Sequence, residues 1–89
     1  RSIKIMKKTL NNINYNDYIK FDMFLSDKEY KRLYKEAKKE FNKHFKESFE
    51  DHACFISSSA LHGFYFPNLE YIRVIAFNKK NNKPEVIYN

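Results

Sequence analysis

The residue types most capable of chemistry gather just beyond the middle of the chain. Asp51, His52 and Cys54 lie close together, with His44 upstream and His62 downstream. A thiol nucleophile needs a histidine base within reach of its sulfur, and on a strand His52 and Cys54 would point to the same side. Structural zinc sites instead pair their ligands at short spacing, as in CxxC or HxxxH, and the sequence contains neither motif.

The wider sequence does not support an enzyme. Cys54 stands between two apolar residues, a setting typical of a buried and inert cysteine. The serines at 57–59 have no glycines around them to form a nucleophile elbow, and a chain with 1 Gly cannot build a phosphate-binding loop. We therefore predict no catalytic residue, no metal site and no cofactor.

A short aromatic run, HGFYFPNL, contains that single glycine. It resembles the strand signature of the RNA-recognition motif at Gly63, Phe64 and Phe66, and departs from it at Tyr65 and Pro67. That fold also needs a second helix after this strand, whereas the residues that follow here are again typical of a strand. The resemblance does not extend to the family.

The same run has a structural interpretation. On a strand, Phe64 and Phe66 would share one side and Tyr65 would take the other. We expect the two phenylalanines to pack under a helix, Tyr65 to be exposed and Gly63 to permit a bulge.

One long helix is predicted over residues 27–48. Ser26 with Glu29 three residues later forms a capping-box pattern, and no Gly or Pro interrupts the segment. Apolar residues then recur at spacings of three and four, which gives one apolar stripe. The stripe consists of Tyr30, Leu33, Tyr34, Ala37, Phe41, Phe45 and Phe49.

Strands are predicted on both sides of this helix. Before it, residues 3–9 alternate weakly and residues 18–25 alternate well, with an Asn-rich turn between them. After it, strands are expected over 53–61, 63–66, 71–77 and 84–88, the last two joined by a hairpin loop. The order β-β-α-β-β-β predicts a two-layer α+β fold with a four- to five-stranded, mostly antiparallel sheet. β-Grasp-like and split-βαβ-like arrangements both fit it.

Length and composition suit a single domain spanning residues 1–89. The apolar fraction is 43%, no apolar run is long enough to span a membrane, and the one cysteine has no partner for an internal disulfide. The start at Arg1 suggests a domain excised from a longer chain, and the sequence leaves localisation open. An excess of lysine and asparagine indicates an AT-rich genome.

The net charge of +6 is concentrated at the two ends of the chain. Residues 1–16 sum to +4 and residues 71–89 to +3, whereas the helical segment 27–51 sums to only +1. Acids and bases alternate along that helix, as on a solvated outer face. A basic patch forms only if the N-terminal segment and the loop at 79–83 lie at the same end of the sheet.

Two functions from different classes fit this charge distribution. The first is a non-enzymatic module that binds DNA or RNA mainly through phosphates, with low sequence specificity and tyrosines that stack on bases. The second is a protein-interaction domain that docks through a sheet edge, such as the 84–88 strand, or through exposed aromatics. We predict no integral membrane association. The candidate nucleic-acid contacts are Lys4, Lys7, Lys8, Tyr65, Tyr71, Arg73, Lys79, Lys80 and Lys83.

Overall fold

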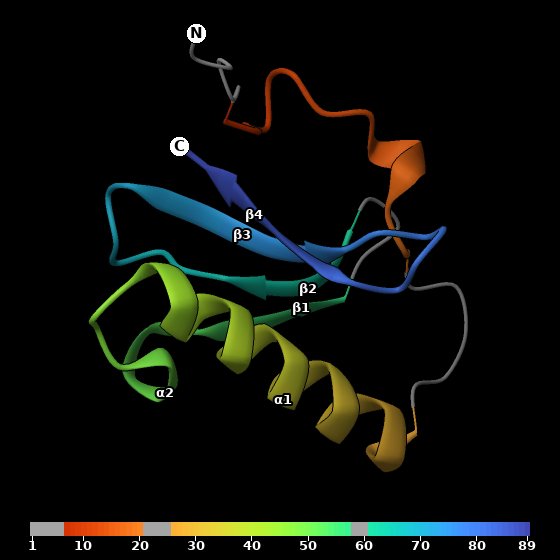
Figure 1. Ribbon diagram of the computed structural model, residues 1–89, viewed down its shortest axis with the longest axis horizontal. Coiled ribbons are helices and arrows are strands. Elements are labelled where there is room, and N and C mark those ends of the chain that lie inside the picture. Colours follow the sequence, from red (N-terminus) through yellow and green to blue (C-terminus); the bar gives the residue numbers. More distant parts are fainter. Residues whose placement is uncertain (1–6, 21–25, 58–60) are drawn as a thin grey trace, which may run out of the picture.

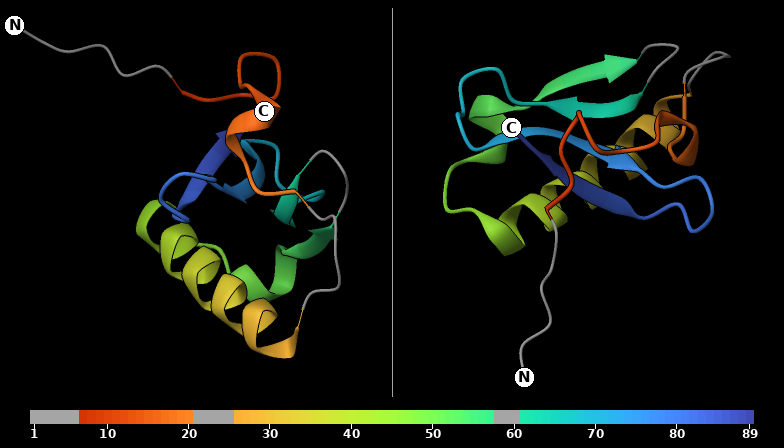
Figure 2. Two further views of the ribbon diagram at one scale, coloured as in Figure 1. Left: turned by 90° about the vertical axis from the view of Figure 1, so that its right-hand side faces the viewer. Right: turned by 90° about the horizontal axis from the view of Figure 1, so that it is seen from above.

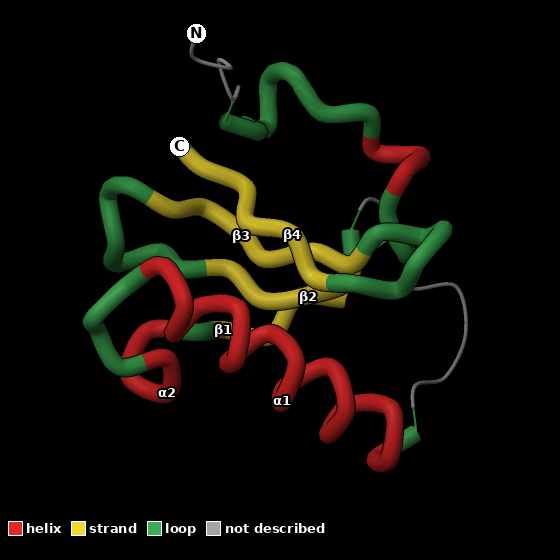
Figure 3. The backbone as a smooth tube through the Cα atoms, in the orientation of Figure 1, coloured by secondary structure: helices red, strands yellow, loops and turns green. Residues whose placement is uncertain are grey.

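The computed structural model describes residues 7–20, 26–57 and 61–89. One long helix packs against a four-stranded antiparallel sheet, which confirms the α+β class (Figure 1). The strands follow the helix in sequence and lie in the order β1-β2-β3-β4 (Figure 3). The elements are η1 (Tyr15–Asp17), α1 (Asp27–His44), α2 (Phe49–His52), β1 (Cys54–Ser57), β2 (His62–Tyr65), β3 (Ile72–Phe77) and β4 (Pro84–Tyr88).

The start of α1 follows the predicted cap. The Ser26 hydroxyl oxygen accepts a hydrogen bond from the backbone N–H of Glu29 at 3.2 Å. This bond satisfies one of the N–H groups that every helix start leaves without a partner.

The end of α1 comes earlier than the sequence indicates. Phe45 is extended, and its N–H donates to the carbonyl oxygen of Phe41 at 2.9 Å, which closes the last turn at His44. The chain then turns into α2, whose first residue, Phe49, is buried. Phe49 therefore joins the core from a separate short helix and not from the apolar stripe of α1.

The two strands predicted before α1 fall largely outside the described residues. Their described ends form isolated bridges: Thr9 pairs in parallel with Tyr88, and Tyr18 pairs antiparallel with Asn78. The described part of the N-terminal segment therefore lies beside β4 and the β3–β4 hairpin.

An aromatic core lies between α1 and one face of the sheet. Phe41 of α1 stacks on Phe66 with ring centroids 5.1 Å apart, and Phe64 and Phe66 are almost completely buried. Tyr65 between them is exposed, so the predicted alternation across this strand is confirmed. The buried residues of this core are Leu33, Ala37, Phe41, Phe49, Phe64, Phe66, Leu69, Ile72, Ile75 and Phe77.

The N-terminal segment covers part of the opposite face of the sheet. Tyr18 is buried against Val74, Ala76 and Ile87, and Leu10 and Ile13 pack against the same cluster. Figure 2 shows this segment and α1 on opposite sides of the sheet. The sheet is therefore enclosed by the helix on one face and, in part, by a largely irregular segment on the other.

Gly63 is required by close backbone packing. The pairing of β2 runs through it without a register shift on either side, so the predicted bulge at Gly63 is wrong. The irregularity lies instead in β3, between Ile72 and Val74. A Cβ atom at Gly63 would lie 2.1 Å from the backbone oxygen of Ile75, and a backbone atom within a ladder cannot move aside cheaply.

We predict that Gly63→Ala lowers the free energy of unfolding by about 3 kcal/mol, at the upper end of the cost of overpacking a core. Urea unfolding measures this loss. Arg73→Ala, at an exposed position of β3, is the control and should change stability by no more than about 0.5 kcal/mol. A loss below about 1 kcal/mol for Gly63→Ala would mean that β2 and β3 separate easily.

The same measurement tests the core under α1. Phe41 is fully buried and Phe45 only partly, so Phe41→Ala should cost about 3–5 kcal/mol and Phe45→Ala clearly less. If both substitutions cost less than about 1 kcal/mol, α1 does not pack on the sheet in this way.

Candidate nucleic-acid interface

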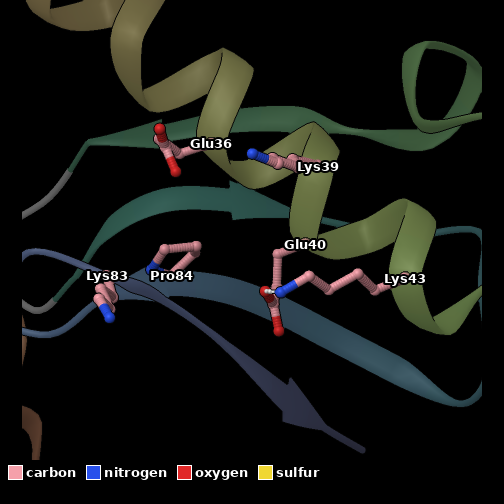
Figure 4. A pocket seen from close by; sticks show the side chains of 6 residues that line it. All are labelled: Glu36, Lys39, Glu40, Lys43, Lys83 and Pro84. Carbon is pink, nitrogen blue, oxygen red and sulfur yellow. Dashed lines mark ion pairs between the residues drawn. The ribbon is translucent and has the colours of Figure 1, made fainter.

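Lysines from two separate parts of the chain line the space between α1 and the start of β4. Lys39 and Lys43 project from α1, and Lys83 lies directly before Pro84, the first residue of β4 (Figure 4). Together with Glu36 and Glu40 they line a hollow of about 220 Å³.

A second hollow of about 430 Å³ continues along β4 and shares Glu40 and Pro84 with the first. The N-terminal segment contributes Lys7 and Lys8 to it, and Val86 and Tyr88 of β4 are also among its lining residues. We call the two hollows together the α1–β4 groove. Their lining residues are Lys7, Lys8, Glu36, Lys39, Glu40, Lys43, His44, Lys83, Pro84, Glu85, Val86 and Tyr88.

Two of the acids in this groove lie beside basic side chains. Glu40 lies 3.5 Å from the ammonium of Lys43 and 3.0 Å from Nε2 of His44. Glu85 lies 2.6 Å from the ammonium of Lys8. Lys39 and Lys83 form no ion pair within the described residues, so their charges remain available to a ligand.

Lys7 makes a different contact. Its ammonium lies 4.8 Å from the centre of the Tyr88 ring, within the range of a cation–π interaction. The backbone of the next residue is also fixed, because the carbonyl oxygen of Lys8 accepts from the N–H of Tyr88 at 2.6 Å. These contacts hold the N-terminal lysines beside the end of β4.

Glu85 is the centre of a polar cluster under the N-terminal segment. Its Oε1 accepts hydrogen bonds from the hydroxyl of Tyr18 at 2.8 Å and from Lys8, and its Oε2 accepts from Nδ2 of Asn78 at 3.2 Å. Partial burial raises the pKa of Glu85, but these hydrogen bonds and the charge of Lys8 outweigh it and hold the pKa below its ordinary value. Burial and the Glu85 carboxylate raise the pKa of Tyr18.

Lys79 and Lys80 lie on a separate surface from Lys83. They line a hollow of about 190 Å³ with Asn16, Asp17 and Asn78, at the turn of the β3–β4 hairpin. The backbone N–H of Lys79 donates to the carbonyl oxygen of Asp17 at 2.7 Å. Of the three loop lysines, only Lys83 borders the α1–β4 groove.

The two candidate tyrosines differ in their contacts. Tyr65 is 37% exposed, on the side of β2 away from α1. Tyr71 is 39% exposed, but its ring lies 5.1 Å from that of Phe45 and its hydroxyl donates to Glu47. Burial and this carboxylate raise the pKa of Tyr71 to about 12. Tyr71 is therefore held by neighbours, whereas no ring contact of Tyr65 occurs within the described part of the chain.

The remaining predicted contacts do not join the groove. Arg73 is exposed on β3, and Lys4 lies outside the described residues. The groove instead includes Lys39, Lys43 and Tyr88, which the sequence did not single out. The near-neutral sum over residues 27–51 concealed the two helical lysines, although their spacing of four places them on one side of the helix.

The residues considered for nucleophilic chemistry are arranged differently from the prediction. His52 ends α2 and Cys54 begins β1, so the two do not share a strand face. Cys54 is exposed rather than buried, because it pairs with Tyr65 on an outer strand, on the side away from α1. Within residues 7–20, 26–57 and 61–89, no three His, Cys, Asp or Glu side chains form a group able to hold a metal ion. Among the same residues, no helix has the length and apolar character needed to cross a membrane.

The Glu85 cluster predicts a pH dependence of stability. A carboxylate whose pKa is lowered by folding stabilises the native state above its ordinary pKa, 4.5, and this contribution is lost as the pH falls through the lowered value. We expect Glu85→Gln to cost about 1–2 kcal/mol near pH 7 and the difference from the native chain to shrink on acidification.

Urea unfolding at a series of pH values measures this difference. Glu36→Gln is the matched control, because Glu36 forms no ion pair within the described residues, and it should change stability near pH 7 by no more than about 0.5 kcal/mol. A constant difference between Glu85→Gln and the native chain down to about pH 3 would show that the hydrogen bonds to Glu85 do not depend on its charge.

Comparison with known proteins finds no match: no family model, curated protein or solved structure is similar to this chain at a significant level. Its function therefore has to be inferred from its own residues and their arrangement.

Proposed function

We propose that this domain binds nucleic acid, and that phosphates of the backbone occupy the α1–β4 groove. The observation that carries the proposal is the convergence of lysines from three separate segments on one groove: Lys7 and Lys8, Lys39 and Lys43, and Lys83. Lysines far apart in sequence that border a common hollow give a local positive field that attracts anions.

The pairing of charges inside the groove supports the same function. Glu40 and Glu85 are already engaged by neighbouring cations, whereas Lys39 and Lys83 have no carboxylate partner in the described part of the chain. Lysine is a compact point charge that contacts phosphate without reading a base. We therefore expect binding that depends strongly on salt and little on sequence.

The edge of β4 is poorly suited to pairing with another strand. Strand addition requires a row of open backbone donors and acceptors. Pro84 has no N–H, and the N–H of Tyr88 already donates to Lys8. Among the outward-facing residues of β4, Val86 is then the one whose N–H has no strand partner in the described residues.

A protein-docking function is the second candidate, and it favours the other edge of the sheet. β1 is the outer strand on that side, and no described strand pairs with its outer edge. Phe55 of β1 is 38% exposed next to this edge. An extended segment of a partner protein could add to β1 and cover this ring.

Fluorescence anisotropy with labelled single-stranded and duplex DNA and RNA tests the primary proposal. Lys39→Ala/Lys83→Ala should weaken binding and reduce the slope of log K against log salt by about 1.4–1.8, since each lost phosphate contact contributes about 0.7–0.9. Glu36→Gln should strengthen binding, because it removes a negative charge from the groove.

Lys79→Ala/Lys80→Ala is the matched control. Both residues are exposed and line a separate hollow at the turn of the β3–β4 hairpin, and the variant has the same net charge as Lys39→Ala/Lys83→Ala. Equal losses in the two double variants would show that binding follows overall charge and not this groove. No binding by the native chain at low salt would rule out the nucleic-acid function.

A further inference from the structure

The α1–β4 groove combines charged rims with an apolar floor. Its floor on β4 consists of Pro84, Val86 and Tyr88, every second residue of the strand, and each is partly buried. Because residues at this spacing share one side of a strand, their side chains form a continuous apolar strip. The lysines lie on either side of this strip, on α1 and on the N-terminal segment.

We propose that the ligand of this groove is single-stranded nucleic acid, whose bases lie on the β4 strip while its phosphates meet the lysines. This inference rests on the nucleic-acid function proposed above. A duplex keeps its bases stacked inside and presents only phosphates, so it would contact the lysine rims and leave the apolar floor uncovered. A single strand has unstacked bases that can cover the floor, and their stacking on aromatic rings is sequence-tolerant.

Tyr88 is the residue on which a base would stack. Its ring lies in the groove and is covered by the ammonium of Lys7 at 4.8 Å, and among the described residues the nearest aromatic ring, that of Phe45, is 6.3 Å away. A base that stacks on Tyr88 would replace this ammonium. Lys7 could then pair with the adjacent phosphate. The displacement of Lys7 from the ring would thus give a stacking contact for the base and an ion pair for the phosphate.

The polar groups of the floor fit the same ligand. The N–H of Tyr88 donates outward, away from β3, and backbone direction alternates along a strand, so the N–H and C=O of Val86, a residue that lines the groove, also point outward at the edge of β4. One donor and one acceptor at this point can bond the edge of a base. They are too few for the ladder that an extended peptide would form.

The spacing of the helical lysines agrees with an extended backbone. Lys39 and Lys43 are one turn apart on α1, about 6 Å along the helix axis. On the other side of the groove, Lys83 lies before β4 and Lys8 lies opposite its end, where its carbonyl oxygen accepts from Tyr88. The cationic positions therefore extend along the length of β4, as a ligand that follows this strand would require.

The deciding experiment measures anisotropy with three labelled DNA ligands of about 12 nucleotides, within the range that single-strand-binding folds cover. The ligands are a mixed-sequence single strand, its duplex, and a strand with the same phosphates but abasic sites in place of bases. We expect the single strand to bind at least about tenfold more tightly than either of the others, because both lack bases that can stack.

Substitution of Tyr88 locates the contact. Tyr88→Phe keeps the ring and should retain the preference for the single strand. Tyr88→Leu should lose most of that preference while its weaker binding to the abasic strand stays the same. The unfolding midpoint of each variant is measured alongside, and if Tyr88→Leu does not fold, the abasic comparison with the native chain decides the question.

The outcomes separate this inference from the function on which it rests. Equal affinity for the single strand and the duplex, or for the intact and abasic strands, would overturn the single-strand inference. If Lys39→Ala/Lys83→Ala then still weakened binding selectively, phosphate binding in the groove would stand. No binding to any of the three ligands by the native chain at low salt would overturn both.

Discussion

The burial of Phe41 between α1 and the sheet is the contact on which the rest of the structure depends. Its ring stacks on that of Phe66, the residue directly after β2, and contacts the rings of Phe45 and Phe49. One side chain therefore joins both helices to the sheet. With Phe41 pointing inward, the rotation of α1 about its axis is fixed. Glu40, one residue before Phe41, and Lys43, two residues after it, then lie at the border with β4 and line the groove.

The helix and the strands after it could be predicted because their signals are local. The Ser26 cap, the apolar stripe and the alternation of Phe64, Tyr65 and Phe66 each depend on residues within one element. The end of α1 depended on a tertiary effect, since Phe45 leaves the helix where its ring can still pack on Phe41. The single glycine, Gly63, does mark a backbone constraint, but the constraint is a close contact with β3 and not a bulge.

The groove could not be predicted from charge counted along the chain. Residues 27–51 sum to only +1, because the acids that follow α1 offset most of its own excess of bases, and only the rotation set by Phe41 shows which charged side chains of α1 face β4. The β3–β4 loop illustrates the same difficulty at short range. Lys80 and Lys83 are three residues apart, yet the turn directs them to different hollows. The net charge of each segment therefore shows that both ends of the chain are basic, but it does not show which surface their lysines form.

The N-terminal segment links stability to the proposed ligand site. Glu85 holds Tyr18 and Lys8 through hydrogen bonds, and the backbone of Lys8 occupies the N–H of Tyr88. The same contacts that attach the segment to the sheet thus place two lysines beside the groove and close part of the β4 edge. An edge strand left open would invite pairing with other chains, and Pro84 limits this at the opposite end. What remains open on β4 is a short apolar strip between cations, a surface whose chemistry suits a flexible polyanion better than another strand.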